Sequence, residues 1–225
     1  MTVPVMTIVR ATVLLALLAM TGCQAVIVAA GRPSEDVSRW TTYRVEVGAQ
    51  VVQFSIPPGE SREFPAFTIP TRIDVSREDL FDETLAGPAL LSRMWDYRES
   101  RFVVVDGSLS AGISVSRSNR PLDSLDALKA AVEEASQLYV MKMYAEEGRR
   151  RASDKPVRFD PVRIADRDAW RVTYELSGSH YVVPFDRYHY LGISLRSGGF
   201  TRDDWRTNAN AAADAILKSI RIESQ

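Results

Sequence analysis

The sequence predicts an α+β fold in which helices pack on a largely antiparallel β-sheet. Apolar and polar residues alternate in several short segments, which is the period of half-buried strands. Two longer segments carry apolar residues at steps of three and four, the spacing of amphipathic helices. Strands and helices do not follow each other in a regular βαβ rhythm, so an α+β class is favoured over a parallel α/β sheet.

The first predicted strands form a hairpin centred on residues 48–49. Apolar side chains alternate with polar ones over residues 43–47 and again over residues 51–56, and the Pro-Pro-Gly at 57–59 ends the second strand. Residues 67–75 are predicted to form a further strand, bent at its internal proline.

Residues 77–95 have apolar side chains at helical spacing and carry four acidic residues near their start. The Gly87-Pro88 pair interrupts that pattern, because proline disrupts a helix interior. A broken helix is therefore predicted for this segment.

A second hairpin is predicted around Asp106-Gly107, a residue pair typical of two-residue β-turns. Its strands are residues 101–105 and 111–117. The apolar run at the end of the first strand is unbroken, which favours a central strand covered on both faces.

The most regular helix is predicted to begin after Asp123 or Ser124, since either residue is a suitable N-cap. Gly148 is expected to end it. Its apolar side chains recur at steps of three and four: Leu125, Leu128, Val132, Ala135 and Tyr139.

The remaining elements are a hairpin, a strand and a helix. The hairpin joins residues 162–164 to residues 169–176 and carries Trp170 on its apolar face. A strand is predicted over residues 188–196, and the helix that follows has an apolar stripe beginning at Trp205. Trp170 and Trp205 are therefore predicted to be core residues.

Length and composition limit the classes of protein to consider. The chain has 225 residues, 45% of them hydrophobic and 25% charged, which fits one packed globular domain and excludes a disordered or polytopic membrane protein. The formal net charge is -1, so no excess of positive charge is present to hold a polyanion. Nucleic-acid binding is not expected.

The amino terminus has the proportions of an export signal. An apolar run over residues 11–20 follows Arg10 and leads into Thr21-Gly22-Cys23. Cys23 is the only cysteine, so it cannot form an intramolecular disulfide. The stretch resembles the lipobox of bacterial lipoproteins, which implies cleavage before Cys23 and attachment of lipid to its thiol.

This resemblance divides the chain into a signal peptide (1–22), a lipidated cysteine with its tether (23–42) and one α+β domain (43–223). Gln24 in place of Asp implies the periplasmic face of the outer membrane, so the membrane is one expected partner, bound through the N-terminal lipid. The alternative is an uncleaved anchor, because residues 25–30 extend the apolar stretch.

Few residues suit catalysis or metal binding. His180 and His189 are the only histidines and Cys23 is committed to lipid, which leaves too few ligands for a zinc site. His189 shares a strand face with apolar residues and is interpreted as packed and hydrogen-bonded, while His180 is placed in a loop. Ser114 lacks the second glycine of a nucleophile elbow. No catalytic residue, metal or cofactor is therefore predicted.

Two charged clusters have structural interpretations. Glu78, Asp79, Asp82 and Glu83 open the predicted broken helix, where the helix dipole favours negative charge. Residues 149–151 are three arginines that follow the long helix, where positive charge complements the last carbonyl groups.

Aromatic residues concentrate in segment 177–190, which is predicted to be a loop because it opens on a Ser-Gly-Ser sequence. Tyr181, Phe185 and Tyr188 are the candidate binding residues, since aromatic rings supply large rigid contact areas at protein interfaces. The alternative is that these rings cover one end of the sheet.

Two short stretches resemble the Mog1/PsbP-like α/β/α sandwich. Residues 54–59 (FSIPPG) end the first hairpin, and residues 215–222 (AILKSIRI) take a last helix directly into a closing strand. The resemblance implies a binding or accessory domain. Such domains are similar to those of bacterial lipoproteins and of some periplasmic immunity proteins that neutralise secreted toxins.

Two functions are considered. The first is a membrane-tethered, non-catalytic module that binds a protein partner, with an immunity protein as one form of it. The second is an envelope hydrolase that uses carboxylates, which requires at least two acids to converge in one pocket. The candidate acids are Glu78, Asp79, Asp82, Asp203 and Asp204.

Overall fold

The computed structural model describes residues 35–59, 67–97, 106–147, 155–175, 178–199 and 205–225. These residues form two β-sheets, two α-helices and two short 3-10 turns. The predicted α+β class, with helices packed on a largely antiparallel sheet, is confirmed. The predicted signal peptide, Cys23 and the arginines at 149–151 lie outside the described residues.

The smaller sheet contains the predicted first hairpin. β1 (Thr41–Val47) and β2 (Gln50–Ile56) pair antiparallel across a two-residue turn. The outer strands are β10 (Arg221–Ser224), beside β2, and β3 (Arg72–Ile73), beside β1. The strand predicted over residues 67–75 is thus reduced to the two residues of β3.

The larger sheet has six antiparallel strands in the order β4-β5-β9-β8-β7-β6. Its strands are β4 (Ala86–Tyr97), β5 (Gly107–Arg117), β6 (Pro156–Ile164), β7 (Arg167–Tyr174), β8 (Gly178–Pro184) and β9 (His189–Gly199). The predicted hairpin of β6 and β7 is confirmed, as is the strand β9, which continues beyond its apolar pattern.

The segment predicted as a broken helix is mostly a strand. Only η2 (Glu78–Leu80) is helical, as a single 3-10 turn, and β4 follows it. The register of β4 against β5 shifts near Ala89, and both Leu90 and Leu91 are buried. A bulge of this kind turns neighbouring residues to the same side, which produces an apolar spacing that resembles a helix.

The hairpin predicted at Asp106-Gly107 is also wrong. Gly107 is the first residue of β5 and pairs with Tyr97 on one side and with Gly199 on the other. A side chain at Gly107 would overlap the Trp205 ring, so close packing and not a turn requires glycine here. The strand predicted before it lies outside the described residues.

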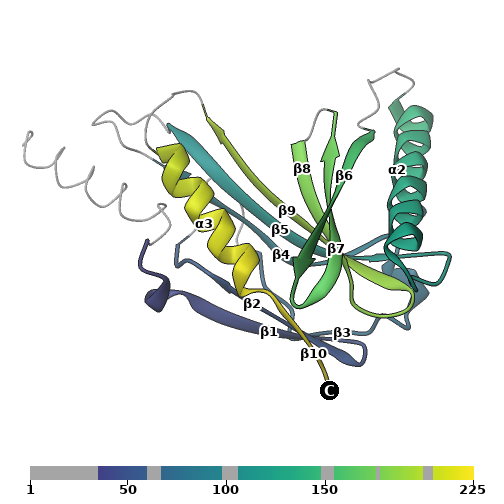
Figure 1. Ribbon diagram of the computed structural model, residues 1–225, viewed down its shortest axis with the longest axis horizontal. Helices are drawn as coiled ribbons and strands as arrows, with labels where there is room; N and C mark the ends of the chain where they lie inside the picture. The colour runs from purple at the N-terminus through teal and green to yellow at the C-terminus, as the bar shows by residue number, and fades with distance from the viewer. Residues whose placement is uncertain (1–34, 60–66, 98–105, 148–154, 176–177, 200–204) are drawn as a thin grey trace, which may run out of the picture.

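Two α-helices pack on these strands (Figure 1). α2 (Leu125–Glu147) begins as predicted at Ser124, whose Oγ accepts the Ala127 N–H at 3.1 Å. α3 (Trp205–Ser219) lies against β2, β5 and β9 and leads into β10. The 3-10 turn η1 (Val37–Arg39) precedes β1. Neither described helix is long and apolar enough to be a candidate membrane span.

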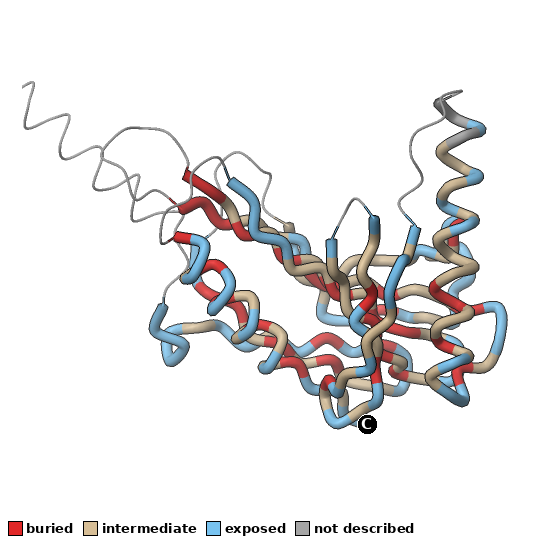
Figure 2. Tube along the Cα trace, turned by 45° about the horizontal axis from the view of Figure 1, so that its top comes forward, coloured by how far each residue is buried: buried red, intermediate tan, exposed pale blue. Residues whose placement is uncertain are grey.

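The buried hydrophobic side chains form two clusters. Figure 2 marks the buried residues in red along the chain. The main cluster joins the two sheets to α3, and the smaller one joins α2 to β7, β8 and β9. Val182 and Val183 belong to different clusters, so the larger sheet is buried on both faces. Trp205 is fully buried, as predicted, whereas Trp170 is only half-buried and donates its indole N–H to the Leu125 carbonyl at 2.8 Å.

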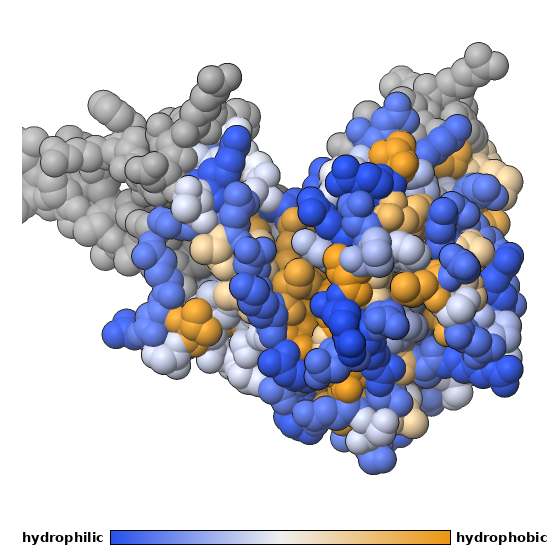
Figure 3. All heavy atoms as spheres, viewed as in Figure 1, coloured by the Kyte–Doolittle hydropathy of each residue, from blue (hydrophilic) through white to orange (hydrophobic). Residues whose placement is uncertain are grey.

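One face of the larger sheet is not completely covered. Figure 3 shows apolar side chains in a hollow between α3 and the strands β6 and β8. Tyr181 and Leu195, on β8 and β9, pack against the main cluster but stay half-buried. α3 therefore covers only part of this face.

Candidate functional site

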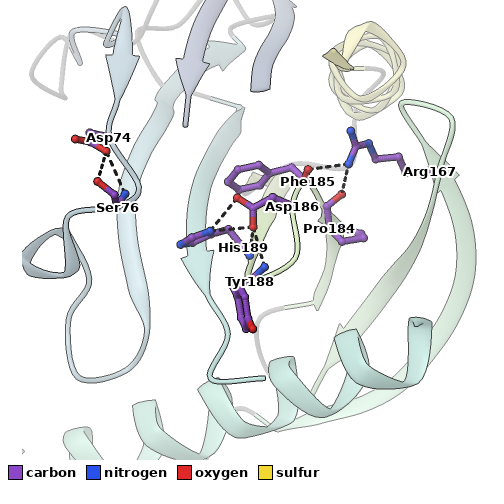
Figure 4. Close-up of polar contacts among 8 residues, drawn as sticks. All are labelled: Asp74, Ser76, Arg167, Pro184, Phe185, Asp186, Tyr188 and His189. Atoms are coloured by element: carbon purple, nitrogen blue, oxygen red, sulfur yellow. Dashed lines mark hydrogen bonds and ion pairs between the residues drawn. The ribbon is translucent and has the colours of Figure 1, made fainter. Parts of the chain in front are cut away.

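A turn of residues 185–188 joins β8 to β9, and the Asp186 carboxylate organises it (Figure 4). Its Oδ1 accepts the backbone N–H groups of Tyr188 and His189, each at 2.8 Å. The Nδ1 atom of the His189 ring lies 3.0 Å from both carboxylate oxygens. An aspartate that binds the backbone two residues ahead forms an Asx turn, which holds the chain in one conformation.

The environment of Asp186 keeps its carboxyl group ionised. Burial opposes ionisation, but the hydrogen bonds from the His189 ring and from the backbone N–H groups of Tyr188 and His189 outweigh it. Together they hold the pKa of Asp186 below its usual value. The carboxylate is therefore a constant hydrogen-bond acceptor at neutral pH.

Two aromatic rings enclose the imidazole of His189. Its centroid lies 5.4 Å from that of Phe81 and 5.7 Å from that of Phe185, and both contacts are stacked. The side chain of His189 is 13% exposed. The interpretation of His189 as a packed, hydrogen-bonded residue is confirmed, and its contacts fix the turn against the core.

The segment that precedes α2, residues 118–122, is hydrogen-bonded to the backbone of this turn. The backbone N–H of Ser118 donates to the Tyr188 carbonyl at 2.7 Å, and that of Leu122 donates to the Arg187 carbonyl at 2.8 Å. Hydrogen bonds from a second segment restrict the backbone on either side of the exposed side chains. The turn is therefore preorganised.

Arg167, the first residue of β7, holds the other end of the turn. Its guanidinium donates to the carbonyl oxygens of Pro184 and Phe185 at 3.3 and 2.8 Å and to the Gln50 side chain at 3.2 Å. Burial lowers the pKa of Arg167, although the nearby Asp186 carboxylate opposes that shift. Arg167 thus links the turn to β2 in the smaller sheet.

The structure separates the three aromatic residues predicted to bind a partner. The predicted loop over residues 177–190 is wrong, because most of this segment forms β8 and the start of β9. Tyr181 is half-buried against the main core, and Phe185 is buried, with 1% of its surface exposed. Tyr188 is 41% exposed. Phe185 therefore belongs to the core, Tyr181 is partly covered, and Tyr188 is the most exposed of the three.

Arg187 extends the exposed surface beside Tyr188. Its guanidinium carbon lies 5.7 Å from the centroid of the Tyr188 ring. Its Nε atom lies 3.7 Å from the Asp123 carboxylate, and the two side chains of this ion pair are 66% and 69% exposed. Exposed ion pairs contribute little to stability, so this pair adds an exposed positive charge beside the Tyr188 ring without fixing the turn.

Each described acidic residue considered for hydrolysis is paired with a basic side chain. Glu78 and Asp79 lie in the three-residue turn η2 and strand β4 follows the cluster, so the longer predicted helix, whose dipole would favour these acids, does not form. Asp203 and Asp204 lie outside the described residues. The other acids bind basic side chains: Glu78 binds Arg117, Asp79 binds Arg77, and Asp82 and Glu83 both bind Lys142.

Asp82 has a second, structural role. Its Oδ1 accepts the backbone N–H and hydroxyl of Thr84 at 2.8 and 2.6 Å and the Ala86 N–H at 3.2 Å, which shapes the turn into β4. Burial raises the pKa of Asp82, but these hydrogen bonds outweigh it, and the pKa lies below its usual value. Asp82 is thus ionised, and its carboxylate stabilises the turn that precedes β4.

The other sequence candidates have ordinary packing roles. His180, predicted in a loop, lies in β8, where its ring packs edge-on against Tyr174 at 5.1 Å. Ser114 lies within β5, as expected for a strand residue. In the part of the chain that the structure describes, no group of three His, Cys, Asp or Glu residues could hold a metal ion.

Sequence reasoning missed two residues that shape the turn. Asp186 precedes His189 by three residues and lies two residues after Pro184, and an aspartate near a proline is a recognisable turn signal. Arg167 comes from another hairpin, and no local pattern connects it to the carbonyl groups that it binds.

Comparisons with protein-family models, curated proteins and solved structures found no significant match to the chain.

Proposed function

We propose that the chain is a lipid-anchored, non-catalytic lipoprotein of the bacterial envelope that binds a protein partner through Tyr188 and its neighbours. The supporting observation is an exposed aromatic ring on a turn that side-chain and backbone hydrogen bonds hold in place. Aromatic anchors carry much of the energy of protein interfaces, and a preorganised turn loses little conformational entropy on binding.

The position of the turn supports this function. β9 begins at the turn, at His189, and ends at Gly199, which pairs with Gly107 near the start of α3. The first described residue, Glu35, is hydrogen-bonded to Asn208 of α3. An anchor upstream of Glu35 thus joins the domain at one end of the larger sheet and leaves the Tyr188 surface at the other end (Figure 1).

We expect Cys23 to carry the lipid and to be the mature amino terminus. The apolar run over residues 11–20 and the small residues before Cys23 are the basis of this expectation. Mass spectrometry of the protein purified from envelopes should show acyl mass on the wild type and none on Cys23→Ser. An unmodified wild type, or an acylated Cys23→Ser variant, would show that the anchor is wrongly assigned.

We expect a photoreactive phenylalanine analogue at position 188 to cross-link one protein partner in intact envelopes. The ring is exposed and its backbone is fixed, so a partner that covers the turn must contact it. Once the partner is identified, Tyr188→Ala should weaken its binding about 30-fold, which corresponds to about 2 kcal/mol.

The matched control places the same analogue at Tyr139, which is 53% exposed on α2. The adduct should be absent there. Identical adducts at both positions, or no adduct at position 188, would count against a binding site at the turn. Circular dichroism checks that each variant folds.

A further inference from the structure

A cavity of about 220 Å³ lies between η1, α3 and the end of β4, far along the molecule from the Tyr188 turn. It is lined by Glu35, Val37, Trp40, Tyr97, Asn208, Ala211, Ala212 and Ala215. Three elements that are distant in sequence thus line an open-sided cavity that no part of the proposed protein-binding site uses.

The walls of this cavity are mainly apolar. α3 contributes three alanines, whose short side chains leave open the space between the helix and η1, and Trp40 and Tyr97 supply aromatic surface. The two polar residues of the lining bind each other, because the Asn208 amide donates to Glu35 at 3.2 Å. A ligand with many polar groups would find few partners here, whereas an aliphatic ligand needs none.

The cavity is also close in sequence to the proposed anchor. Glu35 follows Cys23 by twelve residues, a length of chain that spans at most about 43 Å when fully extended. If Cys23 is anchored in a bilayer, the cavity is always held near the membrane surface. Acyl chains are the aliphatic groups present there in quantity.

We propose that this cavity binds a segment of one acyl chain of a lipid, an inference that rests on the anchoring part of the proposed function. The segment would lie between the alanine face of α3 and the rings of Trp40 and Tyr97. Each methylene that leaves water for this lining favours the complex. The chain can come from a bilayer phospholipid or from the protein's own anchor.

The test uses the full lipoprotein and two photoreactive probes. In one arm the purified protein is placed in vesicles that contain a phospholipid with a diazirine on its acyl chain. In the other arm cells are fed a diazirine fatty acid, so that the anchor itself carries the probe. After illumination, cross-linked peptides are mapped by mass spectrometry, and labelling is expected on the peptides that contain Trp40 or Tyr97.

The arms distinguish the two lipid sources. Labelling of cavity residues in the vesicle arm identifies a bilayer lipid, and labelling in the fatty-acid arm alone identifies the anchor. Labelling in neither arm overturns the inference. The outcome is separable from the Tyr188 experiment, which reports on a protein partner, and from the mass of Cys23, which reports on anchoring.

Two variants make the test specific. Ala211→Phe and Ala215→Phe place a ring in the cavity and should reduce labelling at least tenfold, and Ala211 is exposed, so its variant should fold normally. The control is Asn210→Phe, an exposed neighbour on α3 that does not line the cavity. Equal labelling in all three variants would show that the acyl chain binds elsewhere.

Discussion

Trp205→Ala is expected to lower the free energy of unfolding by about 3–5 kcal/mol, the range typical of large aromatic residues truncated in a core. The ring is fully buried and lies 5.8 Å from that of Tyr97. It also packs against Gly107 and Gly199, where a larger residue would overlap it. Its removal leaves a space that these strands cannot readily fill, because they are paired with each other. Urea denaturation followed by circular dichroism measures the change.

Two further variants show whether the loss comes from packing. Within the described residues the indole N–H of Trp205 has no hydrogen-bond partner, so Trp205→Phe should recover part of the lost stability. Thr207→Ala, an exposed position on the same helix, should change stability by less than about 0.5 kcal/mol. A Trp205→Ala variant with wild-type stability would contradict the assigned packing of α3.

Asp186→Ala is expected to have the second-largest effect, a loss of about 2–3 kcal/mol, because hydrogen bonds to charged groups are strong. The substitution leaves the backbone N–H groups of Tyr188 and His189 and the His189 ring without their acceptor. If the proposed partner binds at Tyr188, the substitution should also weaken that binding, since the turn that presents Tyr188 loses its Asx bonds. The exposed acid Asp168, changed to Ala, is the matched control.

The contribution of Asp186 should depend on pH. Its folded-state pKa is lowered, so its ionised form favours the folded state. The contribution is complete above the unfolded-state pKa of about 3.9 and is lost as the pH falls through the lower folded-state pKa. The stability difference between wild type and Asp186→Asn should therefore shrink below about pH 4. A difference that grows on acidification would show that the carboxylate does not stabilise the turn.

The candidate site was only partly predictable from the sequence. The aromatic cluster pointed to the region of the proposed binding site, and within it Tyr188 is exposed. The exposure of a ring depends on whether its position faces the core, and Phe185 faces inward against His189. Arg167 reaches the turn from another hairpin, which only three-dimensional contact reveals.

By itself the sequence determined the elements whose pattern is local. The alternation of apolar and polar residues specified the hairpin of β1 and β2, and the apolar stripe with its Ser124 cap specified α2. Both signals are local, because the side-chain period and the hydrogen bonds of a helix cap involve residues only a few positions apart. The tertiary structure decided the secondary structure of segments whose apolar residues fit both the helical and the strand period. Residues 86–97 became β4 because pairing with β5 buries Leu90 and Leu91 together, and Gly107 joined a strand because Trp205 leaves no room for a side chain. Such outcomes depend on which distant strand or helix packs against the segment, and the local sequence pattern does not specify that element.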